Sequence, residues 1–258
     1  MITNYHTHTT RCNHAKGTER EYVEAAIKSG LKVLGFSDHA PYPYPDPEPY
    51  YIQHTMKLDE LEGYCDTVLA LREEYKNDID IRLGLETEYY PEFFDKHIEN
   101  LSNYPIEYLV LGQHFQQNGK KSCGSGRASD DRDRFIEYCN DIYAAFATGR
   151  FSYLAHPDLI NFTGDSSFYD EQMRQLCRKA NEYNMPVEIN FHGYFAKKHY
   201  PNEAFWKIAG EENCDVIYAL DAHETIEFQF DEHLQRASEM AARCNLHILD
   251  DIKIVKPF

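Results

Sequence analysis

The alternation of short apolar runs with helical stretches constrains the fold of this 258-residue chain more than any other feature. Seven apolar runs occur, at Ile2–Tyr5, Val33–Phe36, Ile81–Leu85, Tyr108–Leu111, Phe151–Ala155, Val187–Ile189 and Val216–Leu220. Helical stretches are expected between or after them, at Glu19–Ser29, Leu58–Lys76, Asp133–Thr148, Tyr169–Tyr183, Glu203–Glu211 and Glu232–Cys244. This pattern is typical of a parallel sheet of βα units, whose strands are buried on both faces and therefore lack polar alternation.

The residues that follow the runs favour a closed barrel over an open doubly wound sheet. Histidine, aspartate or glutamate comes directly after six of the seven runs, giving His6, His8, His14, Asp38, His39, Glu86, His114, His156, Asp221 and His223. In a barrel, the carboxyl ends of all the strands converge on one mouth, where active sites lie. The sequence therefore predicts an α/β barrel with a polar site at that end.

The residue types at these positions predict a metal centre. Imidazoles with carboxylates and no thiolate suit zinc, manganese or iron. His6 and His8 are two residues apart, so on an extended strand they point to the same face, and Asp221 and His223 do likewise. One ion takes about four ligands. Nine candidate ligands are therefore too many for one ion and enough for two or three.

Charge and cysteine content exclude several classes of protein. With 26 basic and 43 acidic residues, the net charge is −17, which argues against nucleic acid as a partner. An anionic substrate would need a local positive charge, which bound metal ions supply. The seven cysteines are scattered without a C-x-x-C pair, so we expect neither a disulfide framework nor a zinc knuckle.

The length and the two ends of the chain suggest a simple organisation. A chain of 258 residues suits one α/β barrel, so residues 1–258 are expected to form a single domain. No signal peptide is visible, and no apolar run approaches the ~18 residues of a membrane span. We therefore expect a cytoplasmic protein with no membrane partner, and the sequence leaves its oligomeric state open.

Two long loops stand out. Pro41–Tyr51 holds five of the eleven prolines, which exclude helix and central strand. Gln116–Asp131 is polar, with three glycines and basic residues including Arg127. Long loops at the catalytic end of a barrel are often lids or substrate walls. A purely connecting role is the alternative for each.

An ordered series of motifs resembles the polymerase-and-histidinol-phosphatase (PHP) family, in particular its histidinol-phosphatase branch. The motifs are His6-Thr7-His8, Cys12-Asn13-His14-Ala15, Phe36-Ser37-Asp38-His39, Gly84-Leu85-Glu86, Leu111-Gly112-Gln113-His114-Phe115, Ala155-His156-Pro157-Asp158-Leu159, Glu188-Ile189-Asn190 and Asp221-Ala222-His223. The resemblance runs from Thr3 to about Leu249. It implies a distorted (β/α)7 barrel of the TIM type that holds three divalent metal ions (zinc, manganese or iron).

The resemblance also implies a ligand set and a reaction. His6, His8, Glu86 and Asp221 would hold one ion, Glu86 would bridge to a second ion held by His114 and His156, and a third would bind His14, His39 and His223. A metal-bridging hydroxide would attack phosphorus, with Glu86, Asp221 and His223 as catalytic residues. The implied activity is hydrolysis of L-histidinol phosphate to L-histidinol and phosphate, a step of histidine biosynthesis.

Two departures from the family pattern concern the grip on phosphate. The histidinol phosphatases usually have Gly-Ser-x-His where this chain has Leu111-Gly112-Gln113-His114, so the small hydroxyl is displaced or absent. Phe195 stands where they commonly have an arginine. The candidates for substrate contact are Arg20, Arg127, Lys197, Lys198 and Gln113. Arginine suits phosphate better than lysine because its planar fork binds two oxygens.

The alternatives are a family phosphoesterase for another small ester, such as a nucleotide or sugar phosphate, and a non-catalytic metal-binding domain. Retention of all nine ligands argues against the second alternative.

Overall fold

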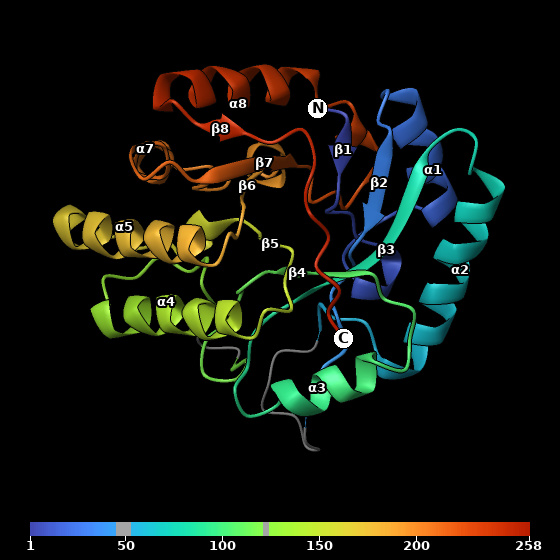
Figure 1. Ribbon diagram of the computed structural model, residues 1–258, viewed down its shortest axis with the longest axis horizontal. Helices are drawn as coiled ribbons and strands as arrows, with labels where there is room; N and C mark the ends of the chain where they lie inside the picture. Colours follow the sequence, from blue (N-terminus) through green and yellow to red (C-terminus); the bar gives the residue numbers. More distant parts are fainter. Residues whose placement is uncertain (45–52, 121–123) are drawn as a thin grey trace.

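A computed structural model describes residues 1–44, 53–120 and 124–258 (Figure 1). Its centre is one sheet of eight parallel strands that follow one another in chain order. The strands are β1 (Thr3–Asn4), β2 (Val33–Phe36), β3 (Asp80–Thr87), β4 (Tyr108–Leu111), β5 (Tyr153–Leu154), β6 (Val187–Asn190), β7 (Asp215–Ala219) and β8 (His247–Ile248). The predicted α/β class with a parallel sheet is confirmed.

Helices cover the outside of the curled sheet (Figure 1). They are α1 (Glu19–Lys28), α2 (Leu61–Glu74), α3 (Phe94–Leu101), α4 (Arg132–Ala147), α5 (Ser166–Glu182), α6 (His192–Phe195), α7 (Glu203–Glu211) and α8 (Asp231–Cys244). All six predicted helices are present, and α3 and α6 are additional. Within the described residues, no helix has the length and apolar character needed to cross a bilayer.

Several helices begin where a polar side chain caps free backbone N–H groups. The side chain of Thr18 accepts from the N–H of Glu21, whose carboxylate accepts in turn from the N–H of Thr18, so α1 starts in a capping box. Asp131, Asp165 and Asn202 cap α4, α5 and α7 in the same position. These caps fix where each helix leaves the loop at the strand end.

The sheet closes at the carboxyl ends of its strands. Thr7, just after β1, forms a parallel bridge with Ala222, just after β7, and the N–H of Leu220 donates to Asn4 Oδ1 over 2.9 Å. These contacts between the first and the seventh strand close the sheet into the distorted TIM-like barrel that the family resemblance implied. The eighth strand was not predicted. It is only two residues long and pairs with Asp215 and Val216 at the amino end of β7.

Two apolar clusters stabilise the barrel. The larger one lies between the sheet and the helices, and the smaller one contains Tyr5, Tyr108, Val110, Tyr153, Ala155, Ile217 and Ile252. Ile252 belongs to the C-terminal segment, which hydrogen bonds tie to the amino ends of β1 and β5. Thr3 Oγ1 donates to the carbonyl of Asp250, and the N–H of Val255 donates to Ser152 Oγ. The segment therefore packs against the barrel at the end opposite to the polar site.

Candidate metal centre and active site

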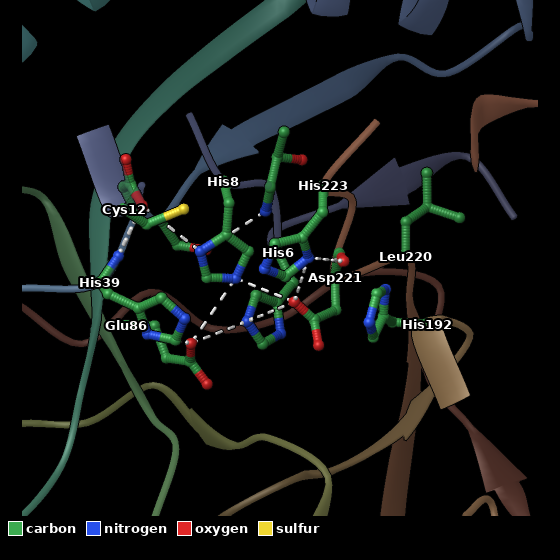
Figure 2. A network of polar contacts seen from close by, with 12 residues as sticks. His6, His8, Cys12, His39, Glu86, His192, Leu220, Asp221 and His223 are labelled. Atoms are coloured by element: carbon green, nitrogen blue, oxygen red, sulfur yellow. Dashed lines mark hydrogen bonds and ion pairs between the residues drawn. The ribbon is translucent and has the colours of Figure 1, made fainter. Parts of the chain in front are cut away.

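The nine predicted metal ligands converge at the carboxyl ends of the strands, and Figure 2 shows the core of this cluster. Seven of the nine side chains are buried, and the other two, His14 and His114, are half-buried. Ligand atoms within 4.8 Å of one another form several groups, among them His6, His8 and Glu86; His6, His156 and Asp221; His8, His39 and His223. The groups overlap, so the structure brings the residues together without separating them into the three predicted sets.

Glu86 lies at the centre of the cluster. Its Oε1 is 2.9 Å from His156 Nε2 and 3.5 Å from His114 Nε2. Its Oε2 is 3.0 Å from His39 Nδ1, 3.4 Å from His6 Nε2 and 3.6 Å from His8 Nε2. Each oxygen thus faces a different group of histidines. The carboxylate of Glu86 therefore lies between two groups of histidines in the cluster.

His14 and His223 show that the cluster suits a cation. Their Nε2 atoms lie 2.9 Å apart, while Nδ1 of each ring lies 2.8 Å from a backbone carbonyl, that of Cys12 or of Asp221. Burial lowers the pKa of His14 to about 4 and that of His223 well below 6.5, so both rings are neutral at pH 7. With both Nδ1–H groups donating to carbonyls, two nitrogen lone pairs face each other. A metal ion resolves that repulsion.

Other buried polar atoms of the cluster also lack a hydrogen bond within the described chain. They are His6 Nε2, His8 Nε2, Glu86 Oε2, His156 Nδ1 and Asp221 Oδ1. His8 Nε2 and Asp221 Oδ1 are 2.8 Å apart without the geometry of a hydrogen bond. Unsatisfied buried polar groups are rare in folded proteins. These residues therefore fit bound divalent metal ions.

Acidic side chains behind the cluster orient the ligands. Glu188 Oε2 lies 2.8 Å from His6 Nδ1, Glu88 Oε1 lies 3.0 Å from His114 Nδ1, and Asp38 Oδ1 lies 3.4 Å from His8 Nδ1. A carboxylate on Nδ1 fixes the ring and leaves Nε2 for a metal. Although burial acts to lower it, Glu188, Asp221 and Glu86 together raise the pKa of His6 well above its usual value. The same arrangement strengthens His6 as a ligand.

Two ligands sit on unusual backbone. His156 has φ of 29° and Asp221 has φ of 52°, a region that residues other than glycine seldom adopt. Each lies two residues beyond the end of a barrel strand, β5 or β7. Such backbone costs on the order of 1–3 kcal/mol and clusters at functional sites, where it turns a side chain into position.

A cavity of about 360 Å³ opens over the cluster. Ligands on its floor are His14, His39, His114, Asp221 and His223. Arg127 lines its wall together with Gly124 and Gly126, all from the predicted loop Gln116–Asp131, which thus forms part of the cavity wall. Of the other predicted loop, Pro41–Tyr51, residues 45–51 lie outside the described residues. The described Tyr42 stacks on His97 at 3.9 Å between ring centroids.

The other predicted substrate contacts do not lie in this cavity. Arg20 is exposed on α1, where it forms an ion pair with Glu74 and donates to Tyr75. Lys197 and Lys198 are exposed and absent from the cavity lining. Gln113 is buried, and its amide binds backbone groups of Tyr89 and Phe115. Among the predicted contacts, the structure brings only Arg127 to the cavity.

Several residues of the site were not assigned a role from the sequence. Glu188, Glu88 and Glu227 act behind histidines, and His192 and Tyr200 line the cavity. His192 has Nδ1 3.0 Å from Glu227 Oε1 and its ring 4.7 Å from that of His223. The sequence signal for Glu188 and His192 is their place in and just after the sixth apolar run, which was the only run without an assigned ligand.

Similarity to known proteins agrees with this site. The model of the PHP domain matches residues 4–192, most of the chain. This chain belongs to the PHP family. The histidinol-phosphatase of Bacillus subtilis is 26% identical over 268 residues, covering 90% of this chain and 97% of that protein. A protein of Deinococcus radiodurans named a probable histidinol-phosphatase is 26% identical over 247 residues, covering 92% and 93%.

A solved structure shares the PHP fold. The histidinol phosphate phosphatase of Lactococcus lactis, crystallised with zinc, L-histidinol and phosphate, superposes with a TM-score of 0.74 at 16% identity. The superposition covers 99% of each chain. At this identity the similarity establishes the fold, and the barrel described above is the fold of that enzyme.

Proposed function

We propose that this protein is a metal-dependent phosphomonoesterase that hydrolyses L-histidinol phosphate to L-histidinol and phosphate. The observation that carries the proposal is a buried cluster of unpartnered imidazole and carboxylate atoms next to a cavity that Asp221 and Arg127 line. The names of the relatives from B. subtilis and D. radiodurans, and the histidinol and phosphate bound to the L. lactis protein, support the choice of substrate.

Three divalent ions (zinc, manganese or iron) are proposed, held by the ligand sets that the family resemblance implies. His6, His8, Glu86 and Asp221 would hold one, Glu86 with His114 and His156 a second, and His14, His39 and His223 a third. Bound there, the ions would activate water for attack on phosphorus and neutralise charge on the phosphoryl oxygens. The distances from both oxygens of Glu86 to surrounding histidines support its bridging role.

The protein's own residues have separate tasks in this reaction. Glu188, Glu88 and Asp38 orient three of the ligating rings through Nδ1. Arg127 is placed to bind a phosphoryl oxygen at the wall of the cavity. Glu88 also lines the cavity, so its negative charge lies where an ammonium group of an amino-alcohol phosphate can reach it.

The test is hydrolysis of a panel of phosphate monoesters by protein reconstituted with zinc, manganese or iron(II). We expect L-histidinol phosphate to give the highest kcat/KM, and chelation to abolish the activity. A nucleotide or sugar phosphate with a higher kcat/KM would retain the phosphatase and replace the substrate. No hydrolysis of any ester, with metals bound, would favour a non-catalytic metal-binding domain.

A further inference from the structure

The segment between α6 and α7, residues 196–202, carries one aromatic side chain to the metal cluster. Tyr200 lines the same cavity as Asp221, His223 and Arg127, and only 7% of it is exposed. The centroid of its ring is 6.3 Å from that of the ligand His156. A tyrosine in a connecting segment therefore reaches the site where phosphate is expected.

The hydroxyl of Tyr200 has no hydrogen-bond partner in residues 1–44, 53–120 and 124–258. A tyrosine side chain ordinarily has a pKa of about 10, so this hydroxyl carries a proton at neutral pH. Two fully buried tyrosines bind backbone oxygens: Tyr108 donates to the carbonyls of Tyr5 and Phe36, and Tyr64 to that of Gly84. The unpartnered hydroxyls of Tyr143 and Tyr153 belong to residues that do not line the cavity, whereas Tyr200 does. A free donor at the floor of a cavity is available to a ligand.

Three contacts hold Tyr200 in place. Asp158, the buried middle residue of η4 (Pro157–Leu159), accepts from the N–H of Asn202 over 2.6 Å and from Trp206 Nε1 over 3.1 Å. His199 Nε2 lies 2.9 Å from the carbonyl oxygen of Leu159. On the other side Gly193 lies so close that a Cβ there would be 2.3 Å from the carbonyl oxygen of Tyr200.

These contacts lie before, after and beside Tyr200 and hold its backbone in place. A donor that is fixed before the substrate arrives stabilises developing charge without reorganising. The anchoring is explained if the position of the Tyr200 hydroxyl matters to the reaction.

We propose that Tyr200 is a substrate-binding and catalytic residue whose hydroxyl donates a hydrogen bond to a non-bridging phosphoryl oxygen, and that Asp158 is its positioning residue. The inference rests on the proposed function, because it takes phosphate as the ligand of the site. In this arrangement Tyr200 and Arg127 share the role of the arginine that the family pattern places at Phe195. Phe195 itself lines a neighbouring cavity and packs against His233 at 4.2 Å.

The test compares Tyr200→Phe with wild type, using Tyr194→Phe as the matched control. Tyr194 is on the adjacent α6, contacts Arg236 and His233, and does not line the cavity. Binding of inorganic phosphate to metal-reconstituted protein is measured by calorimetry, and kcat and KM are measured with L-histidinol phosphate and p-nitrophenyl phosphate. Metal content and melting temperature are recorded for each protein.

We expect Tyr200→Phe to weaken phosphate binding and to lower kcat/KM roughly 10- to 100-fold for both esters, with metal content unchanged. Tyr194→Phe should match wild type. The inference would be overturned if Tyr200→Phe bound phosphate as tightly as wild type does. It would also be overturned if the variant were defective only with L-histidinol phosphate, which has the poorer leaving group of the two esters. A wild type that neither binds phosphate nor hydrolyses an ester would instead contradict the proposed function.

The positioning role of Asp158 is tested by a double-mutant cycle. Asp158→Ala should weaken phosphate binding in wild type but cause little further loss in the Tyr200→Phe background, because both changes remove the same contact. Additive losses would overturn the positioning role. Asp158→Asn, which keeps a side-chain acceptor, should restore part of the phosphate affinity and serves as the folded variant if Asp158→Ala is unstable.

Discussion

Glu188 Oε2 lies 2.8 Å from His6 Nδ1, and both side chains are fully buried although 182 residues separate them in the chain. Asn190 donates to the other oxygen of Glu188 over 2.6 Å and to Asp221 Oδ2 over 2.9 Å. One amide thus ties the carboxylate behind His6 to a second metal ligand. The sixth strand, which supplies no ligand, orients ligands from the first and the seventh.

This relationship predicts that Glu188→Gln lowers metal affinity by roughly 10- to 100-fold, because His6 loses the negative charge that orients and polarises it. Competitive titration of the metal-free protein with zinc measures the effect. Glu182→Gln, on the exposed end of α5, is the control and should bind zinc as wild type does. Equal affinity in Glu188→Gln and wild type would contradict the orienting role.

Metal removal should abolish hydrolysis, and reconstitution should restore two to three ions per chain by elemental analysis. Glu86→Gln should lower the metal content and kcat more than His114→Ala does, since the two oxygens of Glu86 face different histidine groups. A reconstituted content of one ion or none would rule out the three-ion proposal.

Gly112 is required by the close approach of Glu86. A Cβ at Gly112 would lie 1.9 Å from Glu86 Oε1, so Gly112→Ala must displace the central carboxylate. We expect a lower metal content and a loss of kcat of the size seen for Glu86→Gln. Gly63→Ala, in α2 with nothing within 4 Å of the added carbon, is the control and should stabilise the protein by up to about 1 kcal/mol. Full metal content in Gly112→Ala would show that Glu86 can move without loss.

His97 should make the metal-free protein less stable in acid. Burial lowers its pKa from 6.5 to about 3, and its ring contacts Thr87 Oγ1 and the carbonyl of Pro41. Between pH 6.5 and 3 the unfolded chain binds a proton that the folded chain does not. The free energy of unfolding therefore falls by about 1.4 kcal/mol for each pH unit of acidification.

The measurement is denaturant unfolding of metal-free protein between pH 4 and 7. The His97→Asn variant should lose this part of the pH dependence, because it lacks the titrating group. His247→Asn, at an exposed position, should keep the wild-type slope. An unchanged slope in His97→Asn would mean that other groups account for the acid sensitivity.

Arg127→Ala should raise KM for L-histidinol phosphate about 10- to 100-fold, because a charged hydrogen bond to phosphate is lost while the metal cluster stays intact. Lys197→Ala removes an exposed charge outside the cavity and should change KM little. Steady-state kinetics on both variants decide between the two basic residues. A larger effect of Lys197→Ala would move the phosphate contact to the α6–α7 segment.

Local patterns in the sequence determined the strands and the ligands. Val33–Phe36 and Tyr108–Leu111 are strands with the predicted bounds, because short apolar runs flanked by polar residues reflect burial on both faces. The convergence of the nine candidate ligands could be predicted because each follows such a run or its first motif, and parallel strands bring all those ends together. The fold class and the metal centre were thus readable from spacing along the chain.

The tertiary structure alone decided which distant side chains meet. Closure of the sheet and the paths of the loops decide three relationships at the site. Glu188 pairs with His6, Tyr200 approaches His156, and Arg127 lines the cavity over the cluster. Arg20 and Arg127 are chemically alike in the sequence, yet one pairs with Glu74 on the surface and the other lines the cavity. Strand periodicity reports which face a residue occupies, whereas contacts between separate segments depend on the packing of the whole barrel.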